Sequence, residues 1–142
     1  MRALFDVNVL IAIVDEDHVH HGAAHEWWAA SRSAGWATCP LTENGMVRIM
    51  SQSSYKNPIT TSFAIDLLAE QVAQTDHIFW PDDISLRDTA LFDPSCILGS
   101  NQITDVYLLA LAVKNGGRLV TFDRTISIAA VRGAQARHIV VI

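Results

Sequence analysis

The stretch ITDVYLLALAVKNGGRLVTFD, residues 103–123, contains the three features that decide the fold. Its first part predicts an amphipathic helix, because apolar side chains recur at the i, i+3, i+4, i+7 spacing of one helical face. These side chains are Val106, Leu109, Ala110 and Val113. The pair Gly116-Gly117 ends the helix, since glycine readily adopts the backbone conformation found after a helix C-terminus. The apolar run that follows predicts a buried strand, and Asp123 stands directly after it.

The same alternation of strand and helix runs along the whole chain. Strands are expected at residues 2–5, 36–39, 77–80, 118–122 and 138–142. Helices are expected at 7–14, 19–33, from Pro40 onwards, and at 60–73, 84–92, 103–115 and 125–131, with a loop at 93–100. Such alternation predicts an α/β fold. We expect one domain over residues 1–142, built on a central, mostly parallel sheet of four to five strands flanked by helices on both faces.

The composition fits one soluble domain but not an ordinary nucleic-acid-binding protein. Half of the 142 residues are hydrophobic, which is enough for one core. No apolar stretch approaches the roughly 20 residues of a membrane-spanning helix, and the N-terminus does not have the pattern of a signal peptide. A cytoplasmic protein is therefore expected, and the two cysteines, Cys39 and Cys96, suit its reducing environment because they have no metal-ligand spacing and give no disulfide framework. The net charge of −5 opposes binding to RNA phosphates unless some of the acids hold a cation.

Four acidic residues stand where an α/β fold brings chain segments together. Asp6 and Asp123 follow expected strands, and the carboxyl ends of parallel strands form the edge at which such sheets bind ligands. Glu43 and Asp105 fall in the first turns of expected helices. Taken singly, each of the latter two is explained by the favourable position of a carboxylate at a helix N-terminus. All four together predict a site for a hard divalent cation, since carboxylates placed side by side repel one another without one.

The four acids lie within motifs that resemble those of a known family, the PIN-domain ribonucleases, and specifically the VapC-type toxins of bacterial toxin–antitoxin pairs. The resemblance covers essentially the whole length. The motifs are Asp6-Val-Asn8, Thr42-Glu43-Asn-Gly with Arg48 after it, Thr104-Asp105-Val-Tyr-Leu-Leu-Ala-Leu-Ala, and Leu-Val-Thr121-Phe-Asp123-Arg124. It implies a PIN-like fold and a toxin that cleaves RNA with Mg²⁺ or Mn²⁺. It also implies a small cognate antitoxin and a homodimer as partners, without contact to a membrane.

The resemblance also assigns roles to individual residues. Asp6 and Asp105 are expected to bind the metal directly, Asp123 directly or through water, and Glu43 as a ligand or as the base that takes a proton. Asn8 and Thr121 are expected to orient the carboxylates or water around the ion. Arg48 and Arg124 are candidate contacts to the RNA, although a surface ion pair explains Arg48 equally well. One metal ion or two remains open.

Two alternative functions are consistent with parts of the pattern. A haloacid-dehalogenase-like phosphatase or phosphotransferase would use Asp6 as its nucleophile, but Asn8 stands where that family has a second acid. A non-catalytic module would keep the acidic pocket without cleaving RNA.

Other residues have competing explanations. His21 and His25, four positions apart, form either a zinc-binding pair or an ordinary surface pair. Trp27 is expected in the core, and Trp28 at a protein interface.

Overall fold

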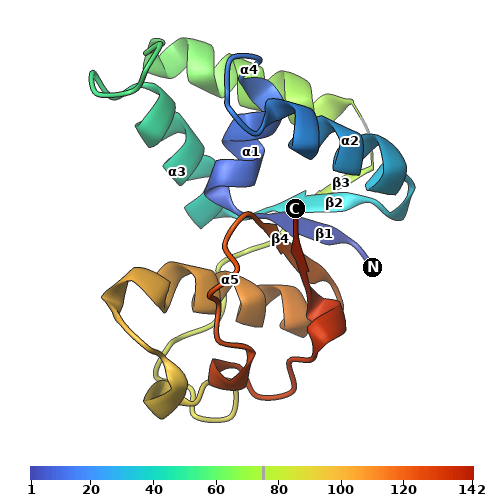
Figure 1. The fold of residues 1–142 in the computed structure, drawn as a ribbon, viewed down its shortest axis with the longest axis vertical. Coiled ribbons are helices and arrows are strands. Elements are labelled where there is room, and N and C mark those ends of the chain that lie inside the picture. Colours follow the sequence, from blue (N-terminus) through green and yellow to red (C-terminus); the bar gives the residue numbers. More distant parts are fainter. Residues whose placement is uncertain (75) are drawn as a thin grey trace.

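The computed structural model describes residues 1–74 and 76–142, and the strands found there form one fully parallel sheet (Figure 1). The sheet has five strands in the order β3-β2-β1-β4-β5, within these described residues. Their bounds are Ala3–Phe5 (β1), Trp36–Thr38 (β2), His77–Phe79 (β3), Arg118–Thr121 (β4) and Ile139–Val141 (β5). The predicted fold is confirmed, and each strand lies within the range expected for it. The first strand of the chain is the central strand of the sheet.

The helices cover both faces of the sheet, as expected. Helices α1 (Val7–Val14), α2 (His21–Ser31), α3 (Pro40–Met50) and α4 (Thr61–Ala73) lie on one face, and α5 (Ile103–Lys114) lies on the other. Alternation along β1 produces this division, because successive side chains of a strand point to opposite faces. In the described part of the chain, no helix combines the length and the apolar character needed to cross a membrane.

Two hydrophobic cores result, one on each face. Ala3 and Phe5 pack with the helices α1 to α4, whereas Leu4 packs with α5. The expectation of Trp28 at a protein interface was wrong, whereas Trp27 packs against the core on this face. Trp28 is the buried one, with 7% of its surface exposed and its ring against Phe5 and Trp36. Trp27 is only partly buried.

The helix expected at residues 84–92 does not form. Short polar side chains bond to the backbone there and offer it an alternative to helical hydrogen bonds. The Asp88 carboxylate accepts from the Ala90 N–H at 2.9 Å, and the Ser85 hydroxyl accepts from the Arg87 N–H at 3.2 Å. The segment therefore runs as a series of turns that ends at Phe92.

The helix expected at residues 125–131 is also missing, apart from one 3₁₀ turn at Ile128–Ala130. The carbonyl of Ala130 accepts from the N–H of Asp93, and Val131 pairs with Phe92 in an isolated antiparallel bridge. The two segments that were expected to be separate helices thus bond to each other. Phe92, Ala130 and Val131 from these segments pack into the hydrophobic core that contains α5.

Gly45 lets α3 approach α1 closely, and replacing it with alanine is expected to destabilise the protein. A Cβ atom at this position would lie 2.7 Å from a methyl group of Val7, the first residue of α1. Overpacking of this kind costs about 1 to 3 kcal/mol, which exceeds the gain of up to about 1 kcal/mol from the better helix propensity of alanine. Thermal and urea unfolding would measure the net loss.

Gly22 of α2 is the matched control, because a Cβ there would meet no atom within 4 Å. We expect Gly22→Ala to be neutral or to stabilise the protein by up to about 1 kcal/mol. Equal effects of the two substitutions would contradict the close packing of α1 and α3.

Candidate functional site

Three aspartates lie around the carboxyl ends of the two central strands. Asp6 directly follows β1 and caps the N-terminus of α1, and Asp123 comes two residues after the end of β4. Asp105 lies in the first turn of α5. Because β1 and β4 are paired in parallel, the structure brings the positions predicted for these three carboxylates to one edge of the sheet.

Asp6 is buried and held by three hydrogen bonds. Its Oδ1 accepts from the backbone N–H of Asn8 at 2.7 Å and of Val9 at 3.4 Å, and its Oδ2 accepts from the Thr121 hydroxyl at 2.5 Å. Burial raises the pKa of Asp6, although these bonds act in the opposite direction. The nearby Asp123 raises it further. This carboxylate is therefore fixed in direction and costly to ionise unless a positive charge is near.

Asp123 is oriented by its own loop. Its Oδ1 accepts from both the hydroxyl and the backbone N–H of Thr125, each at 2.7 Å. These two bonds lower the pKa of Asp123. The backbone N–H of Asp123 donates to the Thr121 hydroxyl oxygen at 3.0 Å. Thr121 thus links the two strand-end aspartates, donating to the side chain of one and accepting from the backbone of the other.

Burial and the charges of Asp6 and Asp123 all act on Asp105 and raise its pKa. Burial raises its pKa to about 6, and the negative charges of Asp6 and Asp123, together with a hydrogen bond to Asp123, contribute to the shift. In the absence of a cation, a proton on Asp105 relieves this repulsion by donating to Asp123. The three carboxylates therefore form one electrostatic unit.

Glu43 lies at the same edge, on the side of β2. It belongs to the first turn of α3, and its Oε1 accepts from the Thr38 hydroxyl at 2.6 Å. Thr38 ends β2, and its hydroxyl oxygen is 2.9 Å from Nε2 of His77 in β3. Since the Thr38 proton is given to Glu43, Nε2 of His77 must be the donor in the second bond. Burial lowers the pKa of His77, which favours the neutral ring.

Removal of the Thr38 hydroxyl is expected to release Glu43. Thr38→Val keeps the buried shape but leaves the carboxylate without its donor. If Glu43 is a metal ligand of a ribonuclease, as the family resemblance implies, RNA cleavage should fall by roughly 10- to 100-fold, the usual effect of losing an outer-shell partner. Steady-state cleavage rates would measure the loss, with circular dichroism to confirm folding. Thr38→Ser retains a hydroxyl and should restore most of the rate, and a wild-type rate for Thr38→Val would exclude this positioning role.

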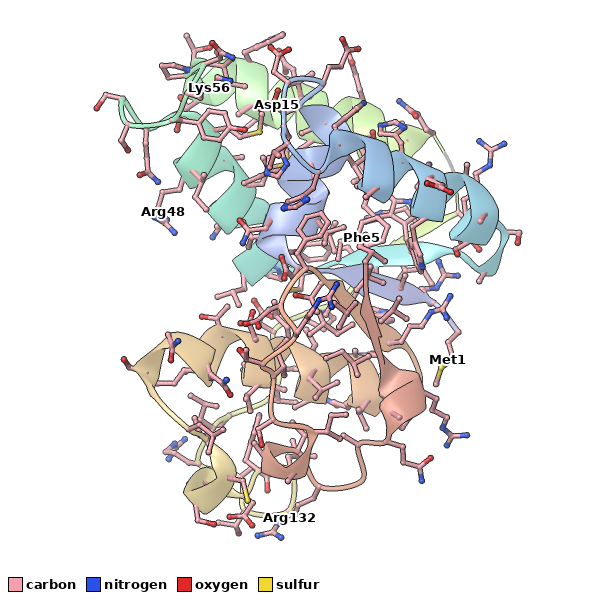
Figure 2. All side chains as sticks on the ribbon, in the orientation of Figure 1. Met1, Phe5, Asp15, Arg48, Lys56 and Arg132 are labelled. Atoms are coloured by element: carbon pink, nitrogen blue, oxygen red, sulfur yellow. The ribbon has the colours of Figure 1, made fainter. Side chains whose placement is uncertain are left out.

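The other predicted residues take different positions around the edge. Asn8 bonds to Asp6 through its backbone N–H, and its side chain is exposed. Arg48 projects from α3 (Figure 2) and lines a groove with Glu43. Arg124 is exposed next to Asp123. Among the residues that the structure describes, neither arginine forms an ion pair, so both are available to phosphate groups.

The donor atoms of the site suit a hydrated hard cation. They are carboxylate and hydroxyl oxygens, which Mg²⁺ and Mn²⁺ prefer. Within residues 1–74 and 76–142, no three His, Cys, Asp or Glu side chains are grouped closely enough to hold an ion by themselves. Mg²⁺ ordinarily keeps several water ligands and needs only one or two carboxylates. The cluster therefore fits an ion whose coordination shell is completed by water and substrate.

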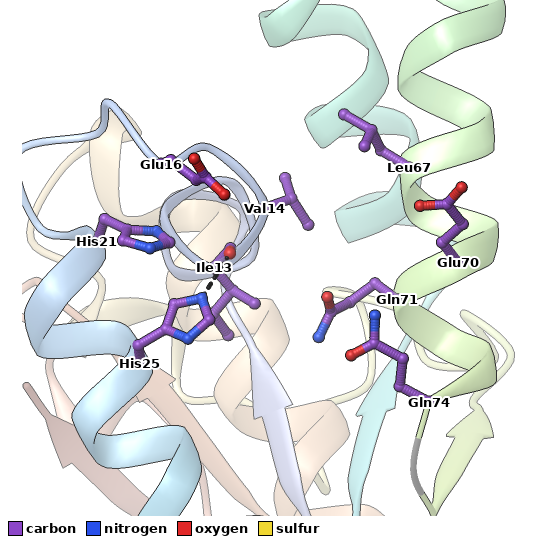
Figure 3. A pocket seen from close by; sticks show the side chains of 9 residues that line it. All are labelled: Ile13, Val14, Glu16, His21, His25, Leu67, Glu70, Gln71 and Gln74. Carbon is purple, nitrogen blue, oxygen red and sulfur yellow. Dashed lines mark hydrogen bonds between the residues drawn. The ribbon is translucent and has the colours of Figure 1, made fainter.

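The histidine pair of α2 has a structural explanation. His21 Nδ1 is 2.7 Å from the Ala12 carbonyl, and His25 Nε2 is 2.9 Å from the Ile13 carbonyl. Both rings thereby cap the C-terminal end of α1, where carbonyls lack helical partners. They line a polar pocket of about 310 Å³ between α1, α2 and α4 (Figure 3). No third zinc ligand joins them among the described residues, so zinc binding has no support.

Sequence reasoning missed the residues that hold the acids in place. Thr38, His77 and Thr125 each bond to a predicted acid or to its partner. Threonine at the end of a buried strand was the available signal, because Thr38 and Thr121 occupy this position in β2 and β4. The contribution of His77 requires knowledge that β3 pairs with β2.

Comparisons with known proteins agree with this architecture. A family model for the PIN domain matches residues 3–132. Ribonuclease VapC44 of Mycobacterium tuberculosis is 48% identical over 139 residues, which is 98% of each chain. Ribonuclease VapC39 of the same organism is 46% identical over 134 residues, 94% of this chain and 96% of the relative.

Two solved structures share the fold at low sequence identity. One is M. tuberculosis VapC20, described as a sarcin-ricin loop cleaving toxin, with a TM-score of 0.62 and 16% identity over 94% of this chain and 96% of that one. The other is Rickettsia felis VapBC2 bound to a DNA fragment from their promoter, with a TM-score of 0.58 and 12% identity over 87% of this chain and 89% of that one. The matches give no support to the phosphatase alternative. The family-model match and the near-full-length relatives show that the chain belongs to the PIN-domain family and, within it, to the VapC-type toxin ribonucleases.

Proposed function

We propose that the protein is an endoribonuclease that hydrolyses RNA phosphodiester bonds with Mg²⁺ or Mn²⁺ and acts as the toxin of a toxin–antitoxin pair. The observation that carries the metal requirement is the gathering of Asp6, Asp105 and Asp123 at one edge of the sheet, where burial first and then the negative charges of Asp6 and Asp123 raise the pKa of Asp105 to about 6. A cation between these carboxylates would remove the repulsion between them. The names of the full-length relatives support the ribonuclease activity.

Each acid has a separate proposed role. Asp6 and Asp105 would bind the ion directly, Asp123 directly or through water, and Glu43 as a ligand or as the base that accepts a proton from the attacking water. When bound, the ion would neutralise phosphate charge and make that water more acidic. Thr121 fixes the direction of Asp6, and Thr38 fixes Glu43. Asn8 holds Asp6 through its backbone N–H.

The exposed arginines would bind the RNA on either side of the acidic cluster. Arg48 lies on the α3 side next to Glu43, and Arg124 lies on the β4 side next to Asp123. Both would contact phosphate groups, for which the planar guanidinium is well suited. They would offset locally the negative charge of the whole chain, which otherwise opposes RNA binding.

The proposed partners are a small cognate antitoxin and a second copy of this chain. The structural neighbour from R. felis, a VapBC pair, supports the antitoxin. The homodimer rests on the family resemblance. Co-expression with any small open reading frame found next to the gene, followed by light scattering of the free protein and of the complex, would test both partners. A free protein that remains monomeric at all concentrations would contradict the dimer.

Cleavage of defined RNA by the purified protein tests the proposed activity. We expect internal cuts that depend on Mg²⁺ or Mn²⁺, that stop with EDTA, and that leave a 5′-phosphate and a 3′-hydroxyl. Cleavage that persists in EDTA would contradict the metal requirement. Products ending in a cyclic phosphate would show that water is not the attacking group.

A further inference from the structure

Gln102 is a buried polar residue that has no role in the proposed mechanism. It directly precedes α5, in the N-cap position, and exposes 6% of its surface. Its side chain does not cap this helix. Instead, Nε2 of Gln102 donates to the backbone carbonyl of Thr125 at 2.6 Å and to the Thr125 hydroxyl oxygen at 3.3 Å. These bonds join the start of α5 to the loop that follows β4.

The two joined segments carry two acids of the cluster. Asp105 lies in the first turn of α5. Asp123 lies in the loop, where its Oδ1 accepts from both the hydroxyl and the backbone N–H of Thr125. A chain of hydrogen-bonded side chains therefore runs from Gln102 through Thr125 to Asp123. Because Gln102 belongs to the same helix start as Asp105, this chain connects the supports of the two carboxylates.

The direction of donation along this chain requires an amide at position 102. The Thr125 hydroxyl gives its single hydrogen to Asp123, so it can only accept from Gln102. The Thr125 carbonyl also can only accept. The NH₂ group of Gln102 therefore faces both acceptors and gives one hydrogen to each. Neither an ionised carboxylate nor an apolar side chain of the same size has a hydrogen to give.

The oxygen of the same amide is left unsatisfied. Oε1 of Gln102 is buried and has no hydrogen-bond partner among the residues that the structure describes. A buried acceptor without a partner destabilises a protein, and an apolar side chain of similar size would avoid this loss. The presence of glutamine here is therefore better explained by what its NH₂ group holds than by a contribution to stability.

We propose that Gln102 is a positioning residue of the catalytic centre. Acting through Thr125, it holds Asp123 in the direction and at the spacing from Asp105 that a divalent cation requires. Two carboxylates from separate segments share one ion only when both are directed towards it. Ile126, next to Thr125, packs into the hydrophobic core that contains α5, so the loop stays attached without Gln102 while Asp123 loses its fixed direction. Because it concerns metal binding, the inference rests on the proposed function.

The substitution Gln102→Met tests the proposal, because methionine has a similar size and no hydrogen to donate. Mn²⁺ is titrated into the RNA-free protein, and binding is followed by water proton relaxation. We expect the Kd for Mn²⁺ to rise by roughly tenfold, the lower end of the range for partners that orient metal ligands. The thermal unfolding temperature in EDTA should stay close to that of the wild type, because the substitution removes two hydrogen bonds and one unpartnered oxygen together.

Two further variants complete the comparison. Gln71 of α4 is also buried, with 9% of its surface exposed, and it lines the polar pocket of Figure 3, to which none of the four predicted acids contributes. Gln71→Met should therefore leave the Kd for Mn²⁺ unchanged. Thr125→Val removes the hydroxyl between Gln102 and Asp123 from an exposed position. In this background Gln102→Met should raise the Kd by a smaller factor than in the wild type, and an equal factor would show that Gln102 does not act through Thr125.

An unchanged Kd for Mn²⁺ in Gln102→Met would overturn the proposal, as would an equal rise in Gln71→Met. A measurement on the wild type does not depend on the folding of any variant. In NMR spectra, Mg²⁺ should shift the side-chain NH₂ signals of Gln102 and leave those of Gln71 in place, and Gln102 signals that do not respond would contradict the link to the cation. If the wild type binds no Mn²⁺, the metal requirement of the proposed function fails, and this inference fails with it. If the wild type and Gln102→Met bind Mn²⁺ equally well, only the positioning role fails.

Discussion

Asp6→Asn is expected to reduce RNA cleavage severely while leaving the protein folded. Asparagine is as good a helix N-cap as aspartate, and its Oδ1 can accept from the same backbone N–H groups of Asn8 and Val9. What disappears is the negative charge that would hold the cation, together with the oxygen that accepts from the Thr121 hydroxyl. A bound metal supplies several kcal/mol of transition-state stabilisation, and losing roughly 3 to 4 kcal/mol lowers the rate by about 10²- to 10³-fold.

Single-turnover cleavage of a defined RNA would measure this loss, and thermal unfolding would show that the fold is retained. Asp6→Ala is the informative second variant, since it also removes the cap and should cost about 1 kcal/mol of stability. If Asp6→Asn cleaves RNA at the wild-type rate, the acidic cluster is not the catalytic centre.

Asp105→Asn is expected to stabilise the metal-free protein at neutral pH and to inactivate it. The pKa of Asp105 is raised from an ordinary 3.8 to about 6 in the folded state. A carboxyl group with a raised folded-state pKa favours folding fully when it is protonated in both states, and this contribution is lost as the pH rises through 6. Asparagine is neutral at every pH, so neither the cost of burying a charge nor the repulsion from Asp6 and Asp123 develops.

The measurement is the unfolding free energy in EDTA between pH 4 and pH 8. Because Asp105 is partly exposed, solvent screens some of the effect, and we expect a gain of roughly 1 to 2 kcal/mol for the variant at pH 7.5. The two proteins should converge below pH 4. Mg²⁺ should stabilise the wild type at pH 7.5 and have little effect on Asp105→Asn. A less stable variant at pH 7.5 would contradict the electrostatic unit.

The positions of Asp6 and Asp123 could be predicted from the sequence because both residues stand at the carboxyl ends of recognisable strands. Asp6 and Asp123 each follow a short apolar run, and the carboxyl ends of parallel strands meet at one edge. Asp105 could be placed for a similar reason, since the helix that begins beside it has a regular apolar period. None of these arguments required knowledge of which strands are neighbours.

The remaining features depend on contacts between distant segments. The link from Glu43 through Thr38 to His77 exists only because β3 pairs with β2. The helix wrongly expected at residues 84–92 had a suitable apolar pattern, but Ser85 and Asp88 bond to the backbone instead. The burial of Trp28 could not be predicted because Trp27 and Trp28 are adjacent in α2 and both rings contact Phe5, so the exposure of each depends on the packing around them.

The central position of β1 affects the order in which the protein folds during synthesis. A ribosome makes β1 before the other strands, yet β4, its neighbour on one side, is made only after β2, β3 and α5. Thr121, which orients Asp6, stands 115 positions later in the chain. Pairing between segments so far apart is slow and completes late. A nascent chain in which β4 has not yet been made therefore lacks the Thr121 hydroxyl that orients Asp6 as well as Asp123, so the acidic cluster assembles only after β4 has joined β1.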